Sequence, residues 1–111
     1  MRIATIALLC LSTLPTLVAA QPAKPTWAET KCIRYKAAWD DLVKKRGLTG
    51  IGPEFLKRHQ DFIDTGCRAS THVCPRSEHE LEVADMMVIA AINGGMASTF
   101  PPFSCKSKSG S

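Results

Sequence analysis

Hydrophobic residues recur at helical spacing in three stretches of the chain, and no stretch alternates long enough to predict a β-strand. The first stretch has one apolar face, formed by Ala28, Cys32, Tyr35, Trp39 and Leu42. The second has a stripe of Phe55, Leu56, Phe62 and Ile63, and the third a main stripe of Leu81, Ala84, Val88, Ala91 and Ile92. The pattern predicts an all-α fold, a small bundle of three helices.

Capping and turn residues mark the expected ends of the first two helices. Thr26 is a good N-cap residue, so the first helix should begin at Trp27, and Gly47 should end it. Pro53 suits the first position of the second helix because that position needs no N–H donor, and Gly66 should end this helix. The connections are short, so consecutive helices should be antiparallel neighbours.

The third helix should be followed by a tail that returns along it. Ser77 has a glutamate three residues later, which is a capping-box pattern, and the helix is expected over residues 78–92. Residues 94–95 are both glycine and permit a reversal of the chain. Phe100 and Phe103 flank two prolines, which require an extended backbone. We therefore expect an extended C-terminal tail, packed back on the third helix through its phenylalanines.

The N-terminus has the pattern of a secretory signal peptide. Arg2 gives a positive start, residues 3–11 form an apolar run, and small residues lead to a cleavage site after Ala20. Polar residues and a proline interrupt the run too early for a membrane span, which needs about 20 apolar residues. The expected organisation is a cleaved signal peptide (1–20), a flexible arm (21–25), one helical domain (26–105) and a disordered tail (106–111).

The charge of the mature chain is mildly basic. Without Arg2, the 14 Lys and Arg residues become 13, against 10 Asp and Glu, which gives a net charge of +3. These charges are spread over the helices rather than gathered in one stripe. No nucleic-acid partner is expected from such a distribution.

Four cysteines remain in the mature chain, and they predict two disulfides. An even number of cysteines in a short exported chain is typical of a disulfide framework. In an antiparallel bundle Cys32, Cys67 and Cys74 lie at one pole, and the tail is long enough to bring Cys105 there. All three pairings are therefore possible. We favour Cys32–Cys67 with Cys74–Cys105, and the main alternative is Cys67–Cys74 with Cys32–Cys105.

Residues with catalytic or metal-binding chemistry form no standard motif. A zinc alternative rests on a C-x4-H-x-C-x4-H pattern of Cys67, His72, Cys74 and His79, which matches no standard module. The chain has no G-x-S-x-G, H-E-x-x-H or C-x-x-C sequence. His59 lies on the apolar face of the second helix and is interpreted as a packed, hydrogen-bonded core residue. We therefore expect no catalytic residue, no metal, no cofactor and no enzymatic activity.

The second half of the third helix is unusual because every residue from Met86 to Ile92 is hydrophobic. We expect this half to be buried on most sides, since the helix must pack against the bundle. Asp85 would either face the apolar stripe as a buried carboxylate or lie in solvent beside Glu82. The alternative is an exposed interaction surface, with candidate residues Met86, Met87, Met96, Phe100 and Phe103.

These features predict a small exported, non-enzymatic protein, in the periplasm by preference or outside the cell. Its helical layout with Phe-Pro and Cys features near the end resembles small periplasmic immunity proteins of bacterial toxin systems, without a shared diagnostic motif. The first hypothesis is an inhibitor or immunity-like factor whose partner is another exported protein. The second is an envelope stress or structural protein that forms a homodimer or binds clients through its third helix. After signal cleavage no membrane span is expected.

Overall fold

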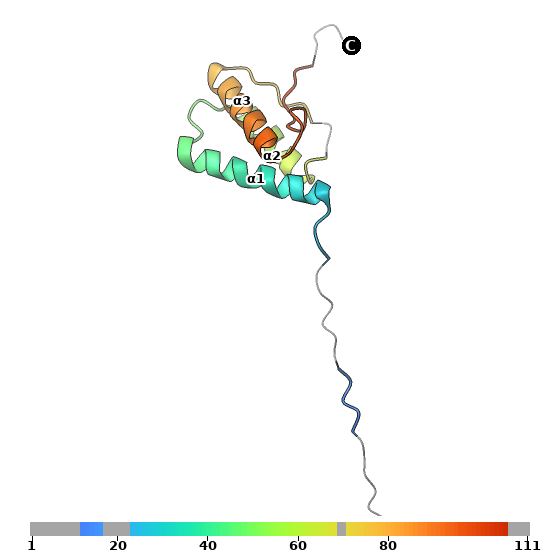
Figure 1. Ribbon diagram of the computed structural model, residues 1–111. Helices are drawn as coiled ribbons and strands as arrows, with labels where there is room; N and C mark the ends of the chain where they lie inside the picture. The colour runs from blue at the N-terminus through green and yellow to red at the C-terminus, as the bar shows by residue number, and fades with distance from the viewer. Residues whose placement is uncertain (1–11, 17–22, 69–70, 107–111) are drawn as a thin grey trace, which may run out of the picture.

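The computed structural model describes residues 12–16, 23–68 and 71–106 (Figure 1). Within these residues the chain forms three α-helices, α1 (Trp27–Arg46), α2 (Pro53–Asp64) and α3 (Glu78–Asn93), and no β-strand. This confirms the all-α bundle that the hydrophobic pattern predicts. The predicted cleavage site after Ala20 and residues 107–111 of the predicted tail lie outside the described residues. Among the helices described, none is both long and apolar enough to cross a membrane.

The helices begin at the residues that the capping signals predict. The Thr26 hydroxyl accepts a hydrogen bond from the backbone N–H of Glu29 at 3.1 Å. The Ser77 hydroxyl accepts one from the N–H of Glu80 at the same distance. Each bond satisfies one of the N–H groups that have no partner within the first turn of a helix. Local chemistry therefore fixes where α1 and α3 start.

The centre of the bundle is aromatic. Tyr35 and Trp39 of α1 meet His59 of α2, with ring centroids 5.5 and 4.2 Å from that of His59. Phe62 of α2 packs edge-on against Tyr35 at 5.5 Å. Tyr35 and His59 are fully buried, and Phe62 and Trp39 are nearly so. This cluster joins α1 to α2.

The C-terminal tail closes the bundle over these rings. The N–H of Val73 donates to the carbonyl of Pro102 at 3.0 Å, and the N–H of Ser104 donates to the carbonyl of Val73 at 3.2 Å. Phe103 stacks on Phe55 with ring centroids 5.7 Å apart, and Phe100 packs edge-on against Tyr35 at 5.6 Å. The two phenylalanines thus pack as expected, but on α1 and α2 rather than along α3.

Two disulfides hold the bundle and the tail. Cys32 in α1 is bonded to Cys67, which follows α2, and Cys74 before α3 is bonded to Cys105 in the tail. The favoured pairing is therefore the one present. The first bond fixes the α1–α2 hairpin, and the second ties the tail to the start of α3. Disulfides of this kind are typical of proteins in an exported, oxidising environment.

The orientation of α3 differs from the expectation. Its buried side carries Glu80, Val83, Ala84, Met87 and Ala91, and this side packs across α1 (Figure 1). Leu81 and Ile92, expected in the buried stripe, are exposed. The prediction that the half from Met86 to Ile92 is buried on most sides is therefore wrong. Two helices and a short tail cover only one side of α3, so its outer side keeps its apolar residues in solvent.

Candidate functional site

The outer side of α3 carries four large apolar side chains in solvent. The exposed fractions are 53 % for Leu81, 40 % for Met86, 59 % for Ile89 and 51 % for Ile92. These residues recur at spacings that bring them to one side of the helix. We call them the outer α3 face. Single exposed hydrophobic residues are ordinary, but four on one side of a single helix are typical of a contact surface.

Negative charge accompanies this apolar face. The 16 residues of α3 include Glu78, Glu80, Glu82 and Asp85 and no lysine or arginine. Asp85 is exposed and lies one turn from Leu81 and one turn from Ile89 on the same side. The carboxylate of Glu82 pairs with the guanidinium of Arg46 at 3.1 Å. The outer α3 face is therefore bordered by carboxylates in the first half of the helix and by no charged residue in the second half, on a protein that is basic overall.

The structure exposes only some of the interaction residues proposed from the sequence and buries the others. Met86 lies on the outer α3 face, whereas Met87 and Met96 lie in the core and are only 0 % and 6 % exposed. Phe100 and Phe103 are half-buried, and both pack on the aromatic cluster. Only Met86 of the five is thus presented to a partner. Sequence reasoning did not select Ile89 and placed Leu81 and Ile92 inside.

A signal in the sequence could have found this face. The residues Glu78, Glu82 and Asp85 follow each other at spacings of four and three, which marks the solvent side of the helix. Continuing that spacing leads to Ile89 and Ile92. The carboxylates therefore set the rotation of α3, whereas the all-apolar run from residue 86 to 92 contains no information about it.

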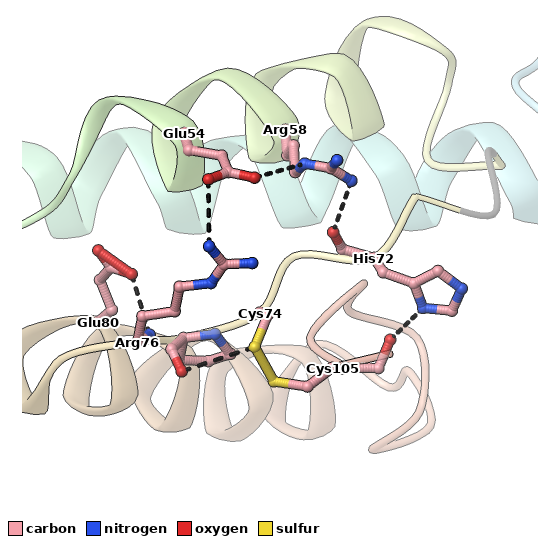
Figure 2. The surroundings of a disulfide bond; sticks show 9 residues. Glu54, Arg58, His72, Cys74, Arg76, Glu80 and Cys105 are labelled. Carbon is pink, nitrogen blue, oxygen red and sulfur yellow. Dashed lines mark hydrogen bonds and ion pairs between the residues drawn. A yellow bond between two sulfur atoms is a disulfide. The ribbon is translucent and has the colours of Figure 1, made fainter. Parts of the chain in front are cut away.

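A second feature is a cleft of about 420 Å³ beside the Cys74–Cys105 disulfide. It lies between the first turn of α2, the segment that leads into α3 and the tail, and Figure 2 shows its polar groups. Its lining consists of Gly52, Pro53, Glu54, Phe55, Arg58, His72, Cys74, Arg76, Glu80 and Lys106. Three of these residues carry a fixed positive charge and come from three separate segments of the chain.

The two carboxylates of the cleft have different roles. Glu80 is buried, and its two oxygens accept the backbone N–H groups of Gly52 at 3.0 Å and Arg76 at 3.1 Å. It therefore ties the start of α2 to the segment before α3 and satisfies two donors. Glu54 is exposed and lies between two guanidinium groups, 3.3 Å from Arg58 and 3.4 Å from Arg76 (Figure 2).

The buried pair of Tyr35 and His59 is the third polar feature. The Tyr35 hydroxyl and His59 Nε2 are 2.7 Å apart, and His59 Nδ1 has no hydrogen-bond partner among the described residues. Burial lowers the pKa of His59 to about 4 and raises the pKa of Tyr35. Both side chains are therefore neutral at pH 7. The rings of Trp39, Phe55 and Phe103 pack around the imidazole, so His59 is a core residue, as its position on the apolar face predicts.

Both cysteines of the zinc site considered from the sequence, Cys67 and Cys74, form disulfides. Cys67 is bonded to Cys32 and Cys74 to Cys105, while His72 and His79 are exposed. Across residues 12–16, 23–68 and 71–106, no group of three or more His, Cys, Asp or Glu side chains is placed to hold a metal ion. The two features that carry candidate binding chemistry in the proposals below are the outer α3 face and the charged cleft.

Comparison of the chain with known protein families, with curated proteins and with solved structures finds no match to any of them.

Proposed function

We propose that this protein is an exported, non-enzymatic binding protein whose outer α3 face docks on one other exported protein, as an inhibitor or immunity-like factor does. The observation that carries the proposal is the exposure of Leu81, Met86, Ile89 and Ile92 on one helix face. Several exposed apolar side chains gathered on one side of a helix are typical of protein–protein contacts. Two disulfides support a working place outside the cytoplasm, and we favour the periplasm.

The energy that this face can supply follows from its apolar side chains. Fully burying a Leu, Ile or Met side chain stabilises by about 1.5–3 kcal/mol. Each residue of the outer α3 face is about half exposed, so a partner that covers it gains about 1 kcal/mol per residue. Four residues give about 4 kcal/mol, which suits the centre of an interface rather than a whole one. The partner must therefore also contact residues around the face.

Asp85 favours a different protein over a second copy of this chain. Consider a two-fold antiparallel pairing of two α3 helices that is centred on the outer α3 face. Its axis would pass midway between Leu81 and Ile92, which is between Met86 and Met87. The two copies of Asp85 would then lie only about 5 Å apart along the helix axes. Burying two like charges side by side is costly. A partner with a lysine or arginine opposite Asp85 would instead form an ion pair within the apolar contact.

The experiment is a capture from the exported fraction with matched variants. The double variant Ile89→Gln, Ile92→Gln removes half of the face, and glutamine keeps a good helix propensity. The expected loss is about 2 kcal/mol, or roughly 30-fold in Kd. Ile33→Gln is the control, because Ile33 is also 59 % exposed but lies on α1. Quantitative mass spectrometry should find one protein retained by the wild type and Ile33→Gln and lost by the double variant.

Two results would contradict the proposal. Equal recovery of the same protein by the wild type and the double variant would mean that the outer α3 face is not the contact. Recovery of many unrelated proteins would support the client-binding hypothesis instead. Circular dichroism of each variant must show unchanged helix content, so that lost binding is not lost folding.

A further inference from the structure

The cleft beside the Cys74–Cys105 disulfide gathers positive charge from segments far apart in the sequence. Arg58 comes from α2, Arg76 from the segment before α3, and Lys106 from the tail. His72 lines the same cleft. Arginine side chains that converge on one point are suited to a planar or tetrahedral oxyanion, because each guanidinium offers several donors in a fixed fork.

In this structure a carboxylate of the protein itself occupies the point of convergence. Glu54 reaches between the guanidinium groups of Arg58 and Arg76, one oxygen facing each (Figure 2). The two separations are 3.3 and 3.4 Å, which is longer than the usual distance of about 2.7–2.9 Å for a charge-assisted hydrogen bond. All three side chains are exposed, and exposed ion pairs of this kind are weak.

We propose that the cleft is a binding site for an oxyanion, a carboxylate or a phosphate group, held between Arg58 and Arg76 in the place that Glu54 takes here. Glu54 then acts as an internal competitor that swings out toward solvent when the ligand binds. Glu80 does not compete, because both of its oxygens accept backbone N–H groups. With Glu54 displaced, the two arginines and Lys106 outnumber the single remaining carboxylate.

The volume and the apolar wall of the cleft indicate a ligand that is larger than a bare ion. Its volume of about 420 Å³ falls in the range of small-molecule sites, which is about 300–1,000 Å³. Phe55, Pro53 and Cys74 supply apolar wall beside the charged groups. A carboxylate or phosphate attached to an apolar or aromatic group would use both kinds of surface.

The test is an NMR titration of the purified protein with both disulfides intact. The probes are inorganic phosphate, acetate and 3-phenylpropionate, each added at constant ionic strength against sodium chloride. We expect saturable shifts of the backbone amide signals of the non-proline residues in 52–58 and 72–76 with phosphate or with the carboxylates. Tighter binding of 3-phenylpropionate than of acetate would identify a carboxylate on an apolar group. Saturation by phosphate alone would identify a phosphate ligand.

Charge-matched variants separate the site from general screening. Glu54→Gln removes the competitor and should tighten binding about fivefold, the factor expected from breaking exposed ion pairs. Asp61→Asn, which makes the same change in charge on the far part of α2, should leave the affinity unchanged. Arg58→Gln and Arg76→Gln should each weaken binding at least tenfold, whereas Lys57→Gln should not.

Two outcomes overturn the proposal. Shifts that stay linear with every probe, or that are spread over the basic C-terminal end of α1 as much as over the cleft, would show unspecific screening. Saturable binding that survives both arginine variants would place the anion elsewhere. Neither outcome affects the outer α3 face, because Ile89 and Ile92 lie outside the cleft lining, so the two proposals fail independently.

Discussion

Acidification is expected to destabilise this protein through one buried side chain, His59. The imidazole lies inside a cage of aromatic rings, and among the residues that the structure describes only the Tyr35 hydroxyl bonds to it. A charged imidazolium is poorly solvated there, which lowers the pKa of His59 to about 4 from the ordinary value of 6.5. The folded state therefore binds this proton much less readily than the unfolded chain does.

The sign and size of the effect follow from proton linkage. The unfolded chain binds the proton first as the pH falls, so the contribution of His59 to the free energy of unfolding decreases between about pH 6.5 and pH 4 and is constant outside that window. Between pH 7 and pH 5 the loss from His59 alone is about 2 kcal/mol. That is a large share of the roughly 5–15 kcal/mol that stabilises an ordinary domain.

Urea denaturation at pH 7, 6 and 5 measures this loss, with matched histidine variants as controls. His59→Gln removes the titration and keeps a side chain that can bond to the Tyr35 hydroxyl. This variant is less stable at pH 7 but should lose about 2 kcal/mol less than the wild type on acidification. His72→Gln makes the same change at an exposed histidine and keeps His59, so this variant should still show the loss of about 2 kcal/mol. Carboxylate titrations are common to all three proteins and cancel in the comparison.

Equal losses of stability in the wild type and in His59→Gln between pH 7 and pH 5 would refute this reasoning. An NMR titration that gives His59 a pKa near 6.5 in the folded protein would refute it as well. Either result would mean that the imidazole reaches water or a compensating charge.

Two further variants, one of them with a matched control, test how the cleft and the tail are held. Glu80→Gln should lower the free energy of unfolding by about 1–3 kcal/mol in thermal or urea denaturation, because the amide cannot accept both backbone N–H groups. Glu82→Gln, at an exposed position, should cost less than about 1 kcal/mol, and equal costs would contradict the role given to Glu80. Replacing Cys74 and Cys105 together by alanine should cost about 3–4 kcal/mol, since their separation of 31 residues closes a long loop. An unchanged urea midpoint would mean that the phenylalanine contacts alone hold the tail.

The positions of the helices could be predicted because local chemistry decides them. Thr26 and Ser77 cap their helices through their own hydroxyls, and Pro53 begins α2 as its missing N–H allows. The antiparallel arrangement of short-connected helices brings Cys32, Cys67 and Cys74 to one pole, which allowed all three pairings, and the favoured one is the one present. Each of these inferences needs only residues that are near in sequence or geometry that helix length dictates.

The site could not be predicted to the same degree because it depends on contacts between distant segments. The buried carboxylate of Glu80 accepts hydrogen bonds from two backbone N–H groups, and one of these belongs to Gly52, 28 residues earlier in the sequence. The spacing of the α3 carboxylates indicates the rotation of this helix, but the exposure of its apolar second half depends on how little of it two helices and a tail can cover. The convergence of Arg58 and Arg76 on Glu54 likewise exists only after α2 and the segment before α3 have come together.

Native mass spectrometry of the protein from the exported fraction tests the central claim most directly. We predict the mass of residues 21–111 less four hydrogens, in a one-to-one complex with a single other protein. The complex should be absent for the double variant Ile89→Gln, Ile92→Gln and present for Ile33→Gln. A homodimer of the wild type with no other protein bound, or a monomer with free thiols and a bound metal ion, would contradict the account.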